Sequence, residues 1–138
     1  MSTLVIFYSF SGKTKRIASD LAKKENADLF EVKAKKPYNI FTAFLKGAPA
    51  AMKQKHTEVA DIKCDFSRYD KVIALAPVWG GFPAPPFNAF LRKIPKGKEV
   101  GIIMVSGGGT TKDSQKIIEF AKGLGLNVTE YKDIKAPK

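Results

Sequence analysis

The sequence predicts an α/β fold in which one parallel sheet of five strands is doubly wound by helices. Five short runs rich in β-branched and aliphatic residues recur along the chain, and helix-like patterns alternate with them. Such alternation is typical of a parallel sheet that has helices on both faces. The length of 138 residues fits a single domain that spans 1–138.

The five predicted strands differ in how continuously apolar they are. They are Thr3–Tyr8, Leu29–Val32, Val72–Ala76, Val100–Val105 and Asn127–Tyr131. The first, third and fourth are almost unbroken in their hydrophobicity, which indicates central strands that are covered on both faces. Asn127–Tyr131 alternates polar and apolar residues, so we expect it at an edge of the sheet.

Four helices are predicted from apolar residues at helical spacing. Their stripes are Ile17, Ala18, Leu21 and Ala22; Ile40, Phe41, Phe44, Leu45 and Ala48; Phe87, Phe90, Leu91 and Ile94; and Ile117, Phe120, Ala121 and Leu124. Pro86 lies near the first turn of the third helix and Pro95 stops it. Thr111 or Asp113 can cap the fourth helix, and Gly125 follows its last turn.

A hydroxyl-rich turn joins the first strand to the first helix, and it reads Ser9-Phe10-Ser11-Gly12-Lys13-Thr14. Hydroxyls, free backbone N–H groups and the positive end of a helix dipole surround one small volume there, which suits a phosphate. A Walker-type triphosphate loop is excluded, because that motif needs a glycine where this chain has Phe7. A helix cap without any ligand is the alternative.

Two further unusual loops follow the third and fourth strands. They read Pro77-Val78-Trp79-Gly80-Gly81-Phe82-Pro83 and Ser106-Gly107-Gly108-Gly109-Thr110-Thr111. Ligands of open parallel sheets bind beyond the carboxyl ends of the strands, where neighbouring strands bring their loops together. We therefore expect all three loops to converge, and the glycines gathered there favour a ligand site over simple turns.

The three loops resemble those of the flavodoxin-like family, whose cofactor is flavin mononucleotide (FMN). Residues 9–14 match the family's phosphate loop, Thr/Ser-x-Thr/Ser-Gly-x-Thr, at every specified position. The run from Pro77 to Pro86 looks like the flavin loop of a subfamily that has Pro-x-Trp-x-Gly-x-Pro-x-Pro-Pro. The resemblance implies a flavodoxin-like sheet with strand order 2-1-3-4-5, and FMN as the cofactor.

Each loop has a role that this resemblance implies. Hydroxyls in the first loop would bind the phosphate, Trp79 would lie against the isoalloxazine, and Gly80 and Gly81 would present backbone groups to its polar edge. The predicted cofactor site comprises Ser9, Phe10, Ser11, Gly12, Lys13, Thr14, Pro77, Val78, Trp79, Gly80, Gly81, Phe82, Ser106, Gly107, Gly108 and Gly109. A core position for Trp79 and a plain turn at the three consecutive glycines are the alternatives.

The chain departs from the family in three respects. It carries 24 Lys and Arg against 13 Asp and Glu, for a net charge of +11, whereas flavodoxins that carry electrons are typically acidic. The Ser106–Thr111 loop has no aromatic residue to cover the outer flavin face. The closing C-terminal helix of the fold is expected to be missing, so one sheet face near the last strand should be bare or covered by a partner.

Two functions follow from the resemblance. One is an FMN-binding electron carrier whose partner is a redox protein of acidic character, and the other is an FMN-dependent oxidoreductase that passes hydride from NAD(P)H to a quinone-type acceptor. Small size and the lack of an evident substrate pocket favour the carrier, whereas the basic surface and the missing aromatic favour the reductase. No catalytic residue is predicted, because a flavin does its own redox chemistry.

Composition excludes several other classes. His56 is the only histidine, so no metal site is predicted. The lysines are dispersed without an aromatic-rich motif, which argues against specific nucleic-acid binding. No stretch approaches the roughly 18 apolar residues of a membrane span, no secretory signal precedes the first strand, and Cys64 is the only cysteine. A cytoplasmic protein is expected.

Overall fold

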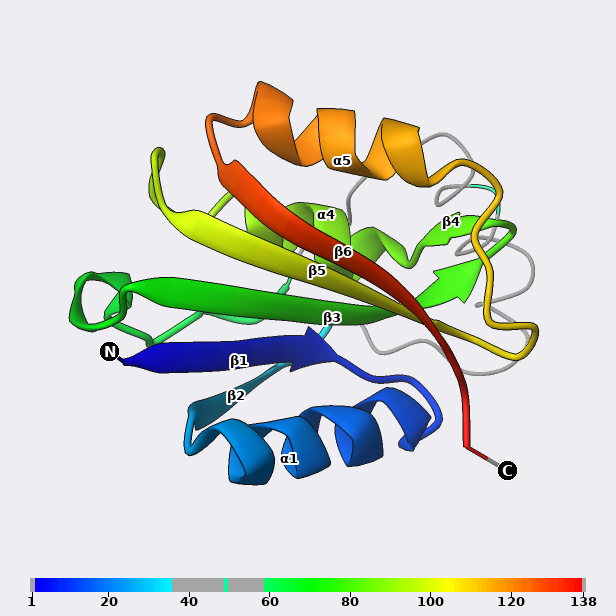
Figure 1. The fold of residues 1–138 in the computed structure, drawn as a ribbon, viewed down its shortest axis with the longest axis horizontal. Helices are drawn as coiled ribbons and strands as arrows, with labels where there is room; N and C mark the ends of the chain where they lie inside the picture. Colours follow the sequence, from blue (N-terminus) through cyan, green and yellow to red (C-terminus); the bar gives the residue numbers. More distant parts are fainter. Residues whose placement is uncertain (1, 36–48, 50–58, 138) are drawn as a thin grey trace.

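The computed structural model describes residues 2–35, 49 and 59–137, and a parallel sheet lies at its centre (Figure 1). Its strands are β1 (Thr3–Tyr8), β2 (Asp28–Val32), β3 (Lys71–Trp79), β5 (Glu99–Ser106) and β6 (Asn127–Lys135). They lie in the order β2-β1-β3-β5-β6, and every neighbouring pair along this path is parallel. Counted in chain order, this is the predicted order 2-1-3-4-5, so the flavodoxin-like fold is confirmed.

The three central strands are apolar on both faces because both faces are largely covered. In β1, β3 and β5 the runs 4–8, 72–76 and 100–105 are buried without interruption. Strand β6 alternates exposed and half-buried residues, and it lies at an edge of the sheet, as predicted. Its pairing with β5 continues to Lys135, four residues beyond the predicted end, because a backbone ladder does not require apolar side chains.

One helix packs on one face of the sheet and two on the other. Helix α1 (Lys13–Glu25) buries Ala18 and Ala22 against β1 and β3. Helices α4 (Pro85–Leu91) and α5 (Ser114–Gly123) pack on the opposite face. Helix α4 ends before Ile94, the last residue of its predicted stripe, yet a following turn still buries that side chain at 4% exposure.

Helix α5 lies where it was predicted, and the structure decides which of two residues caps its start. The Asp113 carboxylate accepts a hydrogen bond from the Lys116 backbone N–H at 3.2 Å, so Asp113 rather than Thr111 caps the helix. Gly125 follows the helix end with a φ of 87°, a conformation that glycine adopts without strain. A short 3₁₀ turn, η2 (Phe66–Arg68), leads into β3 and is capped by the side chain of Asp65.

A small hairpin replaces part of the predicted loop after the third strand. Strand β3 continues through Trp79 and then pairs antiparallel with β4 (Phe82–Pro83). The turn between them consists of Gly80 and Gly81, with φ values of 60° and 91°. A two-residue turn with positive φ at both positions suits the twist of a hairpin, and glycine is a favoured residue there. Pro77-Val78-Trp79 is therefore strand rather than loop.

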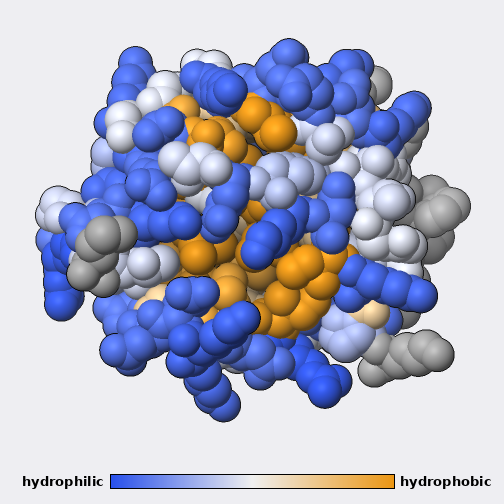
Figure 2. All heavy atoms as spheres, viewed as in Figure 1, coloured by the Kyte–Doolittle hydropathy of each residue, from blue (hydrophilic) through white to orange (hydrophobic). Residues whose placement is uncertain are grey.

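Charged side chains lie on the α1 side of β5 and β6. Lys71 of β3 forms ion pairs with Glu99 of β5 at 3.8 Å and with Glu130 of β6 at 3.2 Å. Glu130 lies over Gly101, where an added Cβ would come within 2.7 Å of its carboxylate. Within the described residues β6 is the last element, and apolar side chains reach the surface in the middle of this face (Figure 2).

Two predictions concern residues outside the described ranges. The expected helix over residues 40–48 lies there, as does His56. In the described ranges, none of the helices has the length and apolar character needed to cross a membrane.

Candidate functional site

Three loops meet at one edge of the sheet, as the sequence predicts. Strand β3 pairs with β1 on one side and with β5 on the other, and all three are parallel. Their carboxyl ends therefore face the same way, toward the side of Figure 1 where the chain terminus C lies. Residues 9–14, 80–81 and 106–111 follow these ends. This edge, which we call the carboxyl edge, collects most of the predicted cofactor residues.

The loop after β1 is organised around the Ser9 hydroxyl. Its Oγ accepts hydrogen bonds from the backbone N–H groups of Gly12 at 3.1 Å and Lys15 at 3.2 Å. Gly12 precedes α1 with a φ of 93°, and an added Cβ would meet no atom within 4 Å. Glycine therefore gives this turn its left-handed backbone and leaves space beside it.

Donors at the start of α1 remain free for a ligand. The backbone N–H groups of Lys13 and Thr14 have no hydrogen-bond acceptor among the described residues. The first N–H groups of a helix lack partners within the helix and carry its positive dipole end, so an anion binds them favourably. Thr14 is 2% exposed, which places it at the floor of the loop, whereas Ser11 is exposed.

Trp79 connects the first two loops. Its ring meets Phe10 edge-on, with the centroids 5.6 Å apart and an interplanar angle of 90°. It meets Tyr8 similarly, at 6.1 Å and 83°. Trp79 is half-buried and packs against the core that lies on the α4 side. The two predicted roles of this residue, core packing and a wall for a ligand, are therefore compatible.

The second and third loops are joined through their backbones. The Lys112 N–H donates to the Gly81 carbonyl oxygen at 2.8 Å. The fit is close enough that a Cβ added to Gly81 would lie 2.6 Å from the Lys112 Cβ. This contact fixes the β3–β4 turn against the segment that precedes α5. Lys112 was not a predicted site residue, because only the three-dimensional pairing reveals it.

The end of β6 holds the loop after β5. The Ala136 N–H donates to the Ser106 carbonyl oxygen at 2.7 Å, and the Thr110 N–H donates to the Ser106 hydroxyl oxygen at 2.9 Å. In the middle of β6, the Tyr131 hydroxyl lies 3.0 Å from the Thr111 hydroxyl and donates to the Asp133 carboxylate at 2.9 Å. Burial and then this carboxylate raise the pKa of Tyr131, so its hydroxyl stays protonated and keeps donating.

Acidic side chains near the carboxyl edge are engaged by neighbours. Glu31, near the end of β2, pairs with Lys15 at 3.3 Å and with Lys33 at 2.7 Å. Burial raises the pKa of Glu31, but the hydrogen bonds from Lys33 and Lys15 outweigh it, so the pKa is lowered overall. Asp113 caps α5 and Asp133 accepts from Tyr131. Only Glu31 is thereby paired with lysines, whereas Asp113 and Asp133 keep their negative charge in these hydrogen bonds.

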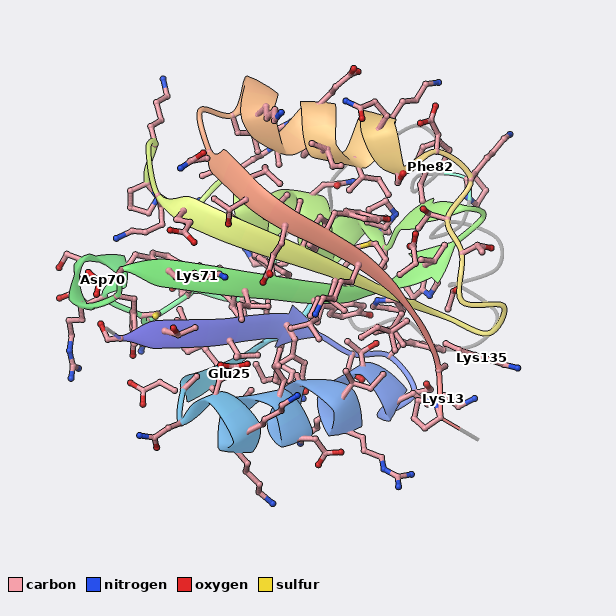
Figure 3. The ribbon with its side chains drawn as sticks, in the orientation of Figure 1. Lys13, Glu25, Asp70, Lys71, Phe82 and Lys135 are labelled. Carbon is pink, nitrogen blue, oxygen red and sulfur yellow. The ribbon has the colours of Figure 1, made fainter. Side chains whose placement is uncertain are left out.

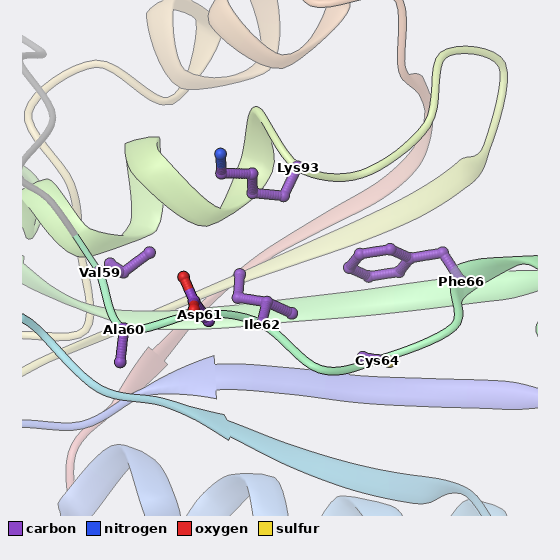
Figure 4. Close-up of a pocket in the computed structure, with 7 residues that line it drawn as sticks. All are labelled: Val59, Ala60, Asp61, Ile62, Cys64, Phe66 and Lys93. Carbon is purple, nitrogen blue, oxygen red and sulfur yellow. The ribbon is translucent and has the colours of Figure 1, made fainter.

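Two cavities lie away from this edge. One of about 450 Å³ is lined by Val59, Ala60, Asp61, Ile62, Cys64, Phe66 and Lys93 (Figure 4). The other, of about 640 Å³, lies near the amino ends of β3, β5 and β6 beside Tyr69, Pro95 and Asn127. Burial, together with the Asp65 charge, raises the pKa of the Cys64 thiol, which disfavours the reactive thiolate. Neither cavity includes any residue of the three loops.

A comparison with protein families agrees with the fold. A family model described as flavodoxin matches residues 2–130. The chain belongs to the flavodoxin family. It is also similar to an uncharacterized protein of Archaeoglobus fulgidus, with 28% identity over 120 residues that cover 87% of this chain and 74% of the relative.

Solved structures of two flavoproteins and a flavodoxin are similar to this chain over most of its length. A flavoprotein from Lactobacillus acidophilus, crystallised in complex with FMN, is 26% identical over 94% of this chain and 91% of its own, with a TM-score of 0.78. The apo form of a flavoprotein from the same organism has a TM-score of 0.68 at 27% identity, over 96% and 92% of the two chains. An archaeal flavodoxin, 17% identical over 98% and 83%, shares the fold with a TM-score of 0.60.

Proposed function

We propose that this flavodoxin-family protein binds FMN at the carboxyl edge and carries electrons. The observation that carries the proposal is the group of free donors at the start of α1. Free N–H groups of Lys13 and Thr14, the Thr14 side chain and the open space beside Gly12 meet there. Such a donor set binds a phosphate dianion well, because each hydrogen bond to it is charge-assisted.

The other loops offer what the flavin ring requires. Trp79 provides a half-buried aromatic surface beside Phe10, and the Gly80-Gly81 turn presents backbone without side chains. Gly107 has no atom within 4 Å of an added Cβ, and Gly108 has only the Thr110 hydroxyl at 4.0 Å, so the third loop leaves room for a ring. When bound, FMN supplies the electron transfer, and the protein supplies binding and orientation.

A second candidate function rests on the same loop. Residues 106–111 contain no aromatic side chain that could cover the outer face of the ring, so a nicotinamide could stack there. The protein would then be an FMN-dependent oxidoreductase that takes hydride from NAD(P)H. Against it, the small size of the chain favours a carrier. We therefore favour the carrier, located in the cytoplasm and exchanging electrons with a redox protein.

Two spectra distinguish these possibilities. The purified protein is incubated with FMN, and its visible spectrum and Trp79 emission are recorded. Binding beside the only tryptophan should quench that emission, and unchanged emission at saturating FMN would place the ring elsewhere. NADPH is then added without oxygen. A carrier stays oxidised until a separate flavoprotein reductase is supplied, whereas bleaching by NADPH alone would establish the reductase.

A further inference from the structure

Three lysines from three different segments surround the carboxyl edge. Lys13 is the first residue of α1. The backbone of Lys112 contacts the Gly80-Gly81 turn. Lys135, at the end of β6, has its Cβ 3.4 Å from the position of an added Cβ on Gly109. All three side chains are exposed. Figure 3 shows both Lys13 and Lys135 at this end of the sheet. We call these three residues the lysine rim.

The lysine rim is not neutralised by the protein itself. Among the described residues, no ion pair involves Lys13, Lys112 or Lys135. Of the nearby carboxylates, Glu31 pairs with Lys15 and Lys33, whereas Asp133 accepts a hydrogen bond from the neutral Tyr131 hydroxyl and keeps its charge. Lys71, the first residue of β3, is different, because it pairs with two glutamates. Exposed lysines that lack an ion pair among the described residues therefore border the place where the proposed cofactor would be reached, and they add to the net positive charge of the whole chain.

We propose that the lysine rim is the docking surface for an acidic redox protein, an inference that rests on the proposed function. Exposed charges of one sign around a reaction site accelerate the encounter with a partner of opposite sign and orient it. The three lysines come from separate segments on the rim of the edge, so they match a broad acidic surface better than a single small anion. Lysine suits this task because its charge stays hydrated on a flexible stem and needs no fixed bidentate partner.

The test compares two haem proteins of opposite charge. FMN-loaded protein, verified by its visible spectrum, is reduced chemically without oxygen and mixed with oxidised cytochrome b5, which is acidic, or with cytochrome c, which is basic. We expect the rate with cytochrome b5 to fall as salt is added, because salt screens exposed charges. The rate with cytochrome c should rise or stay unchanged. A protein that never acquires the FMN spectrum refutes the proposed function before this step.

Charge reversal locates the surface. The double variant Lys112→Glu, Lys135→Glu should lower the rate with cytochrome b5 about tenfold or more at low salt, with FMN retained. A matched variant, Lys24→Glu with Lys122→Glu, makes the same change in net charge at exposed positions in the last turns of α1 and α5. It should lower that rate much less.

Three outcomes would overturn the inference. Equal slowing by both double variants would mean that overall charge, not the lysine rim, controls the encounter. A rate with cytochrome b5 that does not depend on salt would mean that no charged surface takes part. Weaker NADPH binding by the Lys112→Glu, Lys135→Glu variant, with an unchanged cytochrome b5 rate, would assign the lysines to a small anion instead.

Discussion

Both ends of the sheet are tied by backbone hydrogen bonds between segments, such as that from the Asn127 N–H to the Lys98 carbonyl oxygen at 3.0 Å at the amino end, but their side chains differ. At the amino end, side chains tie segments together: the Tyr69 hydroxyl donates to the Asp28 carboxylate at 2.7 Å, and Lys98 Nζ donates to the Tyr69 carbonyl oxygen at 2.6 Å. At the carboxyl edge, many of the ties between segments are backbone hydrogen bonds, such as those from Lys112 to Gly81 and from Ala136 to Ser106. Side chains at the amino end thus stabilise the fold, and several side chains at the carboxyl edge remain free for a ligand.

This contrast explains how a glycine-rich edge can still be ordered. Backbone hydrogen bonds between loops fix their spacing without occupying the hydroxyls and ammonium groups that point outward. A preorganised site binds more tightly because less conformational freedom is lost on binding. We therefore expect backbone changes at the carboxyl edge to weaken FMN binding. Side-chain changes at the amino end should lower stability and leave FMN affinity unchanged.

The largest effect is expected at the contact between the second and third loops. Gly81→Ala places a Cβ on a residue with φ 91° and within 2.6 Å of the Lys112 Cβ, so the backbone must shift. We expect a loss of about 1–3 kcal/mol in the free energy of unfolding without FMN, together with weaker FMN binding. Urea denaturation of the FMN-free protein measures the first, and fluorescence titration the second.

Gly107→Ala is the matched control for this prediction. Gly107 has no atom within 4 Å of an added Cβ and is not among the glycines with positive φ. The FMN-free variant should therefore unfold within about 0.5 kcal/mol of the wild type. If both variants are destabilised to the same extent, the hydrogen bond between the Gly81 and Lys112 backbones does not order this edge.

A smaller effect is expected from the hydroxyl that organises the first loop. Ser9→Ala removes the acceptor of two backbone N–H groups at the start of α1. It should cost about 0.5–2 kcal/mol of stability, the usual range for a lost helix cap. Ser11→Ala is the control, because the exposed Ser11 hydroxyl makes no hydrogen bond within the described residues. Comparable destabilisation by the two would contradict the assignment of Ser9 as the organising residue.

The smallest effect concerns the amino end and depends on pH. The hydrogen bond to Asp28 raises the pKa of Tyr69 from 10 to about 12. Because the folded state favours the protonated phenol, this stabilisation is complete below pH 10 and is lost as pH rises from 10 to about 12. Tyr69→Phe should lose about 0.5–1.5 kcal/mol at neutral pH.

Urea midpoints measured across this pH range test the prediction. The difference in urea midpoint between wild type and Tyr69→Phe should become smaller as pH rises toward 12. FMN affinity at neutral pH should be the same in both proteins. A constant gap would mean that Tyr69 stabilises the fold by packing alone. A change in FMN affinity would mean that the two ends of the sheet are coupled.

The sequence predicted the elements well and their ends less well. Uninterrupted apolar runs identify β1, β3 and β5, since only strands covered on both faces can be so apolar. Residues 77–83 were predicted to form a loop, but β3 continues through Trp79 and pairs with β4 in a hairpin. The Gly80-Gly81 pair suggested the end of regular structure, whereas it forms the hairpin turn. Strand β6 extends over charged residues, which carry no strand signal of their own.

In the candidate site, too, some residues were predicted from the sequence and others were not. Short motifs located Ser9–Thr14 and the glycine-rich loops, because close backbone approach demands those residue types. Lys112, Tyr131 and Ala136 were not predicted, although they hold or border these loops. Their contribution depends on contacts between segments far apart in the chain, and two of the three act through backbone atoms that any residue provides.

The most direct test of the account compares FMN with riboflavin, which lacks the phosphate. The dissociation constants of both are measured for the wild type, for Ser11→Ala combined with Thr14→Val, and for Thr14→Ser, which keeps the hydroxyl. We predict that the wild type prefers FMN, and that the double variant weakens FMN by the equivalent of about 1.5–3 kcal/mol while riboflavin binding is unchanged and Thr14→Ser stays close to wild type. Equal losses for FMN and riboflavin, or no preference for FMN in the wild type, would contradict a phosphate site at the start of α1.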